Sequence, residues 1–130
     1  MVPLKKLFLV LILLFSWSLV VACSSTTSPT PTGPNVVKMV GGTFAISAIS
    51  IHKGDTITFV DDASNGALHI LVIGQNAQQA TEQNAPDFGG LAGKRVDVGQ
   101  NWTTPPWTTP GTFHVTCTVH PAMNLTITVS

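Results

Sequence analysis

Apolar and polar residues alternate along much of the second part of the chain, and this period of two predicts β-strands. In residues 56–60, Ile57 and Phe59 fall on one face and the threonines on the other. Residues 111–117 and 125–130 alternate in the same way. Successive side chains of a strand point to opposite faces, so each segment is expected to bury one face and expose the other.

One segment, residues 44–51, alternates with a change of phase. Its apolar residues fall on even positions up to Ala48 and on odd positions from Ile49. A shift of one residue turns the side chains to the other face of a sheet, so this pattern predicts a β-bulge near Ala48. The Lys-Gly-Asp sequence at residues 53–55 predicts a tight turn, which would join residues 44–51 and 56–60 as a hairpin.

The remaining pattern indicates an all-β domain. Residues 35–39 and 95–99 are predicted to form further strands. Residues 75–87 are the only segment with helical composition, and we expect a short helix or a loop there. Seven or eight strands at such short spacing favour a Greek-key β-sandwich.

The first 22 residues have the pattern of a signal peptide rather than of a folded segment. Two lysines precede an apolar run at residues 7–15, and small residues stand before Cys23. This ending resembles a bacterial lipobox, which implies that Cys23 receives a lipid and holds the protein on the outer face of a bacterial cell membrane. A retained transmembrane helix is the alternative, although residues 7–22 are short for a span of about 20 residues.

The mature chain is predicted to consist of a linker and one domain. Residues 23–34 are rich in serine, threonine and proline, which favours an extended linker before a domain at residues 35–130. The chain has two cysteines, so Cys117 would be a lone thiol outside the cell once Cys23 carries a lipid. A disulfide between the two is the alternative, but metal ligation would also protect the thiol of Cys117.

The charge of the mature chain excludes one class of partner. The sequence has six lysine and arginine residues and six aspartate and glutamate residues, and two of the lysines, Lys5 and Lys6, lie in the signal peptide. Four positive and six negative side chains remain, so the net charge is −2. A faintly acidic domain without a basic stripe is not expected to bind nucleic acid.

Three potential metal ligands stand close together near the C-terminus. Cys117, His120 and Met123 have the spacing Cys-x-x-His-x-x-Met and combine a thiol, an imidazole and a thioether, which suit copper. A blue-copper centre needs a second histidine, and His69 is the best candidate because it lies in an apolar run at residues 67–73. A histidine buried in such a strand needs a partner. Residues 61–66 are expected to form a polar loop leading to it.

The segment from Gly111 to Met123, Gly-Thr-Phe-x-x-x-Cys-x-x-His-Pro-x-Met, resembles the ligand loop of the cupredoxins, the blue copper proteins, of the amicyanin and plastocyanin type. Its short spacing is similar to that of amicyanin rather than azurin, whose loop is longer. The resemblance covers roughly residues 36–130 and implies a cupredoxin sandwich that holds one copper ion. The two strands flanking this loop are expected to form a hairpin that holds the ligands together. The ligands implied are His69, Cys117, His120 and Met123.

The same resemblance implies a function. The protein would carry single electrons between redox partners outside the cytoplasm, as a monomer and not as an enzyme. Electrons would pass through His120, which with Pro121 and Ala122 would form an apolar surface for brief docking. One position departs from the family: Ile70 stands where cupredoxins commonly have Asn, Ser or Thr, whose side chain ties the strand to the ligand loop.

Other functions explain less of the sequence. A module for copper delivery or storage, the second hypothesis, would use the same ligands, but only two methionines remain in the mature chain. Zinc is disfavoured because thioether is a poor zinc ligand. A multicopper oxidase would have histidines beside Cys117, a binuclear centre would need a second cysteine, and an adhesion domain leaves the ligand spacing unexplained. His52 and His114 are expected to be solvated surface residues.

Overall fold

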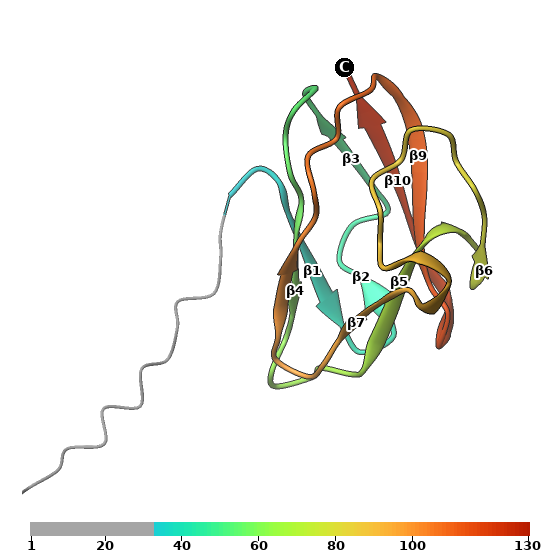
Figure 1. Cartoon of the computed structure of the whole chain (residues 1–130). Helices are drawn as coiled ribbons and strands as arrows, with labels where there is room; N and C mark the ends of the chain where they lie inside the picture. The colour runs from blue at the N-terminus through green and yellow to red at the C-terminus, as the bar shows by residue number, and fades with distance from the viewer. Residues whose placement is uncertain (1–32) are drawn as a thin grey trace, which may run out of the picture.

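The computed structural model describes residues 33–130, which form a β-sandwich of ten strands (Figure 1). This confirms the predicted all-β sandwich, and the count exceeds seven or eight because two of the strands have only two residues each. The elements are β1 (Val36–Val40), β2 (Thr43–Phe44), β3 (Ala48–Ile51), β4 (Thr58–Asp61), β5 (His69–Gln75), β6 (Gln78–Gln79), the 3₁₀ turn η1 (Gly90–Ala92), β7 (Lys94–Val96), β8 (Asn101–Thr103), β9 (Gly111–Cys117) and β10 (His120–Val129).

Two mixed sheets make the sandwich. One has the strand order β2-β1-β4-β8, and the other has the order β3-β10-β9-β5-β6, with β7 also paired to β5. β1 runs parallel to β4, and β3 runs parallel to β10, so both sheets join segments that are distant in the chain. The predicted hairpin of β9 and β10 is present, with Leu125 opposite Val115 and Ile127 opposite Phe113.

The change of phase in residues 44–51 has a different cause from the one predicted. β2 belongs to the sheet of β1 and β3 to the sheet of β10, so the chain crosses between the sheets at residues 45–47. The predicted bulge near Ala48 is therefore wrong, because the phase changes where the chain starts to contribute to the opposite wall of the core. The predicted hairpin with residues 56–60 is also wrong, since β3 pairs with β10 whereas β4 pairs with β1 and β8.

Residues 75–87 form a loop that contains β6 and have no α-helix. Asn76 and Ala77 have positive φ angles of 52° and 61°, which a right-handed helix does not allow. Residue 74, shortly before them, must be glycine, because a Cβ at this position would lie 2.1 Å from the carbonyl oxygen of Gln78. Of the two alternatives predicted from composition, the loop is confirmed.

Aromatic rings fill much of the core between the sheets. Phe59 of β4 is fully buried, and its ring centroid lies 6.1 Å from that of Trp102 and 6.3 Å from that of Phe88. Phe88 also lies 6.2 Å from Trp107, whose buried indole donates a hydrogen bond to Thr104 Oγ1. These contacts join β4, β8 and the segments before β7 and β9 in one core.

The predictions for the N-terminal part fall on other residues. The signal peptide at residues 1–22, the lipid attachment at Cys23 and the linker up to residue 32 lie outside the described residues. Within residues 33–130, no helix has the length and apolar character needed to cross a membrane.

Candidate metal centre

One end of the sandwich, remote from the C-terminus, brings three of the predicted ligands together (Figure 1). His69 begins β5, Cys117 ends β9 and His120 begins β10. β5 and β9 are antiparallel neighbours with Leu71 opposite Cys117, which places the start of β5 beside the thiol. The short turn between β9 and β10 then returns His120 to a position opposite Cys117.

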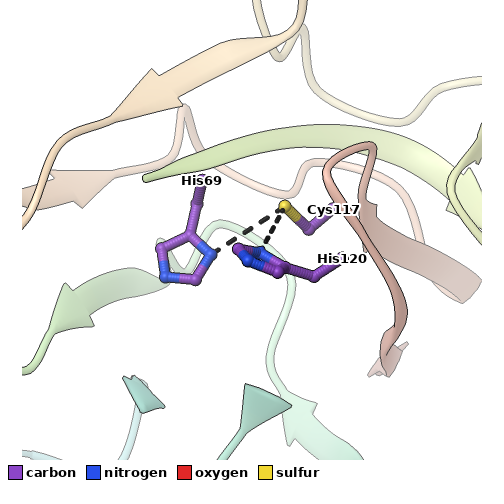
Figure 2. Close-up of side chains that lie close together, drawn as sticks. All are labelled: His69, Cys117 and His120. Carbon is purple, nitrogen blue, oxygen red and sulfur yellow. Dashed lines mark hydrogen bonds between the residues drawn. The ribbon is translucent and has the colours of Figure 1, made fainter. Parts of the chain in front are cut away.

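Both imidazoles turn the same ring nitrogen toward the sulfur (Figure 2). Cys117 Sγ lies 3.8 Å from His69 Nδ1 and 3.5 Å from His120 Nδ1, and the ligand atoms all lie within 4.8 Å of one another. Metal bonds of about 2.0 Å to nitrogen and about 2.3 Å to sulfur separate the nitrogen from the sulfur by roughly 3.5–3.7 Å in a tetrahedral or trigonal site. Within residues 33–130, Cys117 forms no disulfide, and its thiol is buried. The observed spacing therefore fits one metal ion.

A buried carboxylate lies against the imidazole of His69. Asp61 Oδ1 lies 3.1 Å from His69 Nε2, and neither side chain is exposed. An ionised carboxylate can only accept, so this contact favours a proton on Nε2, which would leave the Nδ1 lone pair free for a metal.

Asp61 is the residue that the sequence analysis missed. It was expected in a polar loop, but it ends β4 and is buried on the same face as Ile57 and Phe59. The sequence did contain a signal for this burial, because residue 61 continues the inward-facing alternation of residues 57 and 59.

The backbone replaces the side-chain tether that Ile70 cannot provide. The Ile70 N–H donates to Cys117 Sγ at 3.4 Å, and the Thr118 N–H donates to the Ile70 carbonyl oxygen at 3.0 Å. An N–H donor of this kind stabilises negative charge on a ligand sulfur. The strand of His69 and the ligand loop are thus joined by main-chain groups, which require no particular side chain at residue 70.

Side-chain hydrogen bonds hold the other end of the ligand loop. Thr116 Oγ1 donates to the Met123 carbonyl oxygen at 2.9 Å and accepts from the Ala77 N–H at 3.0 Å. Asn124 Oδ1 accepts from the Asn76 N–H at 2.7 Å. Met123 is fully buried, and these bonds fix its backbone. Its role as an axial ligand stays a prediction.

Of the two histidines predicted to be solvated, only one is. The side chain of His52 is 87% exposed, in agreement with the prediction. The prediction for His114 is wrong: its side chain is 29% exposed, and its Nδ1 lies 2.8 Å from Glu82 Oε1. The His114 N–H also donates to Glu82 Oε2 at 2.8 Å. The loop after β6 supplies this partner, and its fold could not be read from the alternation along β9.

Burial lowers the pKa of His69, and the nearby His120 lowers it further, while the hydrogen bond and the charge of Asp61 oppose this shift. In the unfolded chain the same imidazole takes up a proton near pH 6.5. Between the folded pKa and about pH 6.5 the unfolded state binds more protons, so the metal-free protein should lose stability as the pH falls below about 6.5. Urea unfolding of the metal-free protein between about pH 8 and pH 5 checks this expectation.

Two variants identify the group responsible. His69→Gln should weaken the pH dependence of the unfolding free energy in this range. His52→Gln, at a side chain that is 87% exposed, should leave it in place. A pH profile that is the same in His69→Gln and in the parent would show that another group causes the loss of stability.

The chain resembles known proteins in its three-dimensional structure. No protein-family model and no curated protein matches the chain. A reduced Cu(I) form of an amicyanin variant at pH 4 superposes with a TM-score of 0.57 over 77% of this chain and 85% of that one, at 20% identity. The protein has the cupredoxin fold. The Cu(I) form of a second amicyanin variant gives a TM-score of 0.55 at 22% identity, over 77% of this chain and 85% of that one. Amicyanin from Paracoccus versutus gives 0.53 at 17% identity, over 77% of this chain and 84% of that one.

In this cupredoxin fold, the ligand loop exposes apolar side chains on both sides of His120. Pro121 and Ala122 are exposed, and Val119 exposes 44% of its area. His69 and Cys117 are fully buried, whereas His120 is half-buried. Of the three clustered residues, His120 is therefore the one that reaches the surface.

Proposed function

We propose that this protein is a mononuclear type 1 copper protein that carries single electrons. The observation that supports this most strongly is the convergence of His69 Nδ1, Cys117 Sγ and His120 Nδ1 at the spacing of one metal ion, in a cupredoxin fold. Two imidazoles and a thiolate with a weak thioether ligand are the donor set of blue-copper centres. Bound copper would supply a one-electron couple between Cu(II) and Cu(I).

The chain contributes donors that are held before a metal arrives. Asp61 orients His69, and the Ile70 N–H contacts the Cys117 sulfur. Donors fixed by the folded chain need little rearrangement when the charge at the site changes.

Burial favours an electron carrier over the other functions. His69, Cys117 and Met123 have no exposed surface. An enzyme would need an open coordination position for a substrate, and a copper-delivery module would need access for an exchanging ligand. Here solvent reaches the proposed centre only at the half-buried His120, so its other donors are closed to a substrate or an exchanging ligand.

We further propose that redox partners dock at the surface formed by His120, Pro121 and Ala122. Pro121 and Ala122, which follow His120, are exposed and small, so a partner can approach the imidazole closely. Electron-transfer complexes commonly bury less than about 1,200 Å², so a monomer with this limited surface is sufficient.

Two measurements test the function. The oxidised, copper-loaded protein should absorb intensely toward the red end of the visible spectrum, as a Cu(II)-thiolate site does, and electrons should exchange between oxidised and reduced copies of the protein. A colourless protein that binds Cu(I) or Zn(II) tightly would support copper delivery instead. A coloured protein without electron exchange would argue against both the carrier function and the docking surface.

We propose that a lipid on Cys23 holds the protein on the outer face of a bacterial cell membrane. The support is the apolar run that ends in small residues directly before this cysteine. Cys23→Ser should abolish the incorporation of labelled fatty acid when the whole chain is produced in a bacterium, and Ser24→Ala should not. Equal labelling of the two variants would show that Cys23 is not the attachment site.

A further inference from the structure

Asp61 is a buried carboxylate beside the metal centre. Its side chain has no exposed surface, and its partners are the His69 Nε2 at 3.1 Å, the Gly99 N–H at 2.8 Å and the Ala67 N–H at 3.4 Å. Burial of a carboxylate is costly unless its oxygens are hydrogen-bonded. The Gly99 and Ala67 backbone N–H groups can only donate, so both oxygens of Asp61 serve as hydrogen-bond acceptors.

We propose that Asp61 is a positioning residue of the metal centre, which holds His69 in its coordinating tautomer and biases the site toward the oxidised, more highly charged metal ion. The proposal rests on the copper function proposed above. It concerns which oxidation state the protein favours, which the three clustered ligands alone do not set.

Two physical effects of the Asp61 carboxylate act in the same direction. A carboxylate that accepts the proton of a ligand histidine raises the basicity of that imidazole, so His69 Nδ1 becomes a stronger donor. A negative charge shielded from water also stabilises a doubly charged ion more than a singly charged one. Both effects lower the reduction potential. Among residues 33–130, no ion pair involves His120, so the bias acts through His69.

The surrounding loops hold this carboxylate in one orientation. A Cβ at Gly66 would lie 2.2 Å from Asp61 Oδ2 and 2.5 Å from the carbonyl oxygen of Asp62, so the loop can pass only as glycine. The Gly99 N–H donates to the same Oδ2 atom. With Oδ2 held by this hydrogen bond and no Cβ at Gly66 to displace it, Oδ1 is directed at His69.

Asp61→Asn tests the proposal because it keeps the shape of the side chain and removes its charge. We expect a 10–100-fold loss of Cu(II) affinity, as is typical for partners of ligand histidines, and a smaller loss of Cu(I) affinity. The reduction potential should therefore rise, and each tenfold difference between the two affinities corresponds to about 59 mV. Competition titrations of both ions and voltammetry of the loaded protein measure these quantities.

The matched control is Asp62→Asn. Asp62 is the next residue, and its Oδ1 accepts from the Ser64 N–H at 2.9 Å and from Ser64 Oγ at 2.6 Å, so its loss removes the same charge without removing a bond to His69. We expect a much smaller shift in this variant. An unchanged potential and affinity in Asp61→Asn would overturn the proposal, and so would equal shifts in the two variants.

A measurement on the metal-free parent protein separates this proposal from the copper function. Nitrogen NMR of its imidazoles should show the proton of His69 on Nε2. If the proton lies on Nδ1, the proposal fails, whether or not copper binds and whether or not Asp61→Asn folds. If the parent protein binds no copper, the proposed function fails, and the tautomer still reports on the role of Asp61.

Discussion

Cys117→Ser should abolish the Cu(II)-thiolate absorption band completely while the domain stays folded. Serine keeps the shape of cysteine but cannot supply a thiolate, which is both the metal donor and the source of the colour. Cys117 is fully buried at the end of β9, and its sulfur is the atom that both imidazoles face. Visible absorption of the copper-loaded variant, with circular dichroism as a check on the fold, measures the outcome.

The neighbouring residue provides a control for this substitution. Thr118 is exposed and follows Cys117 directly, so Thr118→Ser changes the same part of the loop without removing a donor. This variant should keep the band. If Cys117→Ser kept it as well, the sulfur would not be a ligand, and the assignment of the centre would be wrong.

Phe59→Ala should lower the free energy of unfolding by about 3–5 kcal/mol, the usual cost of removing a buried aromatic ring. Phe59 has no exposed surface and contacts Phe44, Phe88 and Trp102, so the substitution leaves a cavity lined by rings that cannot easily close it. Urea unfolding of the metal-free protein at neutral pH measures the change.

A substitution at an exposed apolar residue sets the scale. Leu91 is 95% exposed on the η1 turn, so Leu91→Ala should change the unfolding free energy by no more than about 0.5 kcal/mol. A loss below about 1 kcal/mol in Phe59→Ala would mean that the aromatic cluster is not the main support of the core.

The sequence by itself predicted several of the strands and the candidate donors. Alternation along residues 111–117 and 125–130 predicted β9 and the latter half of β10, because the side chains of a strand alternate between its two faces with a fixed period of two. The spacing of Cys117, His120 and Met123 placed potential ligands on one short loop, and the apolar run around His69 predicted the strand that holds the other histidine. These are local properties, and a short segment is enough to express them.

The tertiary structure decided everything that depends on which segments meet. Residues 44–51 show a change of phase that a bulge or a crossing between sheets would both explain, and only the pairing of β3 with β10 selects the crossing. His114 became half-buried because a loop more than 30 residues earlier in the chain supplies Glu82.

The same limit applies at the metal centre. Two hydrogen bonds orient the metal centre. One joins Asp61 to His69, which a loop brings together, and the other joins Ile70 to Cys117, which lie on neighbouring strands. Whether Asp61 faces water or a histidine depends on where the chain returns after that loop. A local pattern predicts which face of a strand is apolar. It does not predict which group a side chain on that face will contact, because the packing of the whole chain determines that partner.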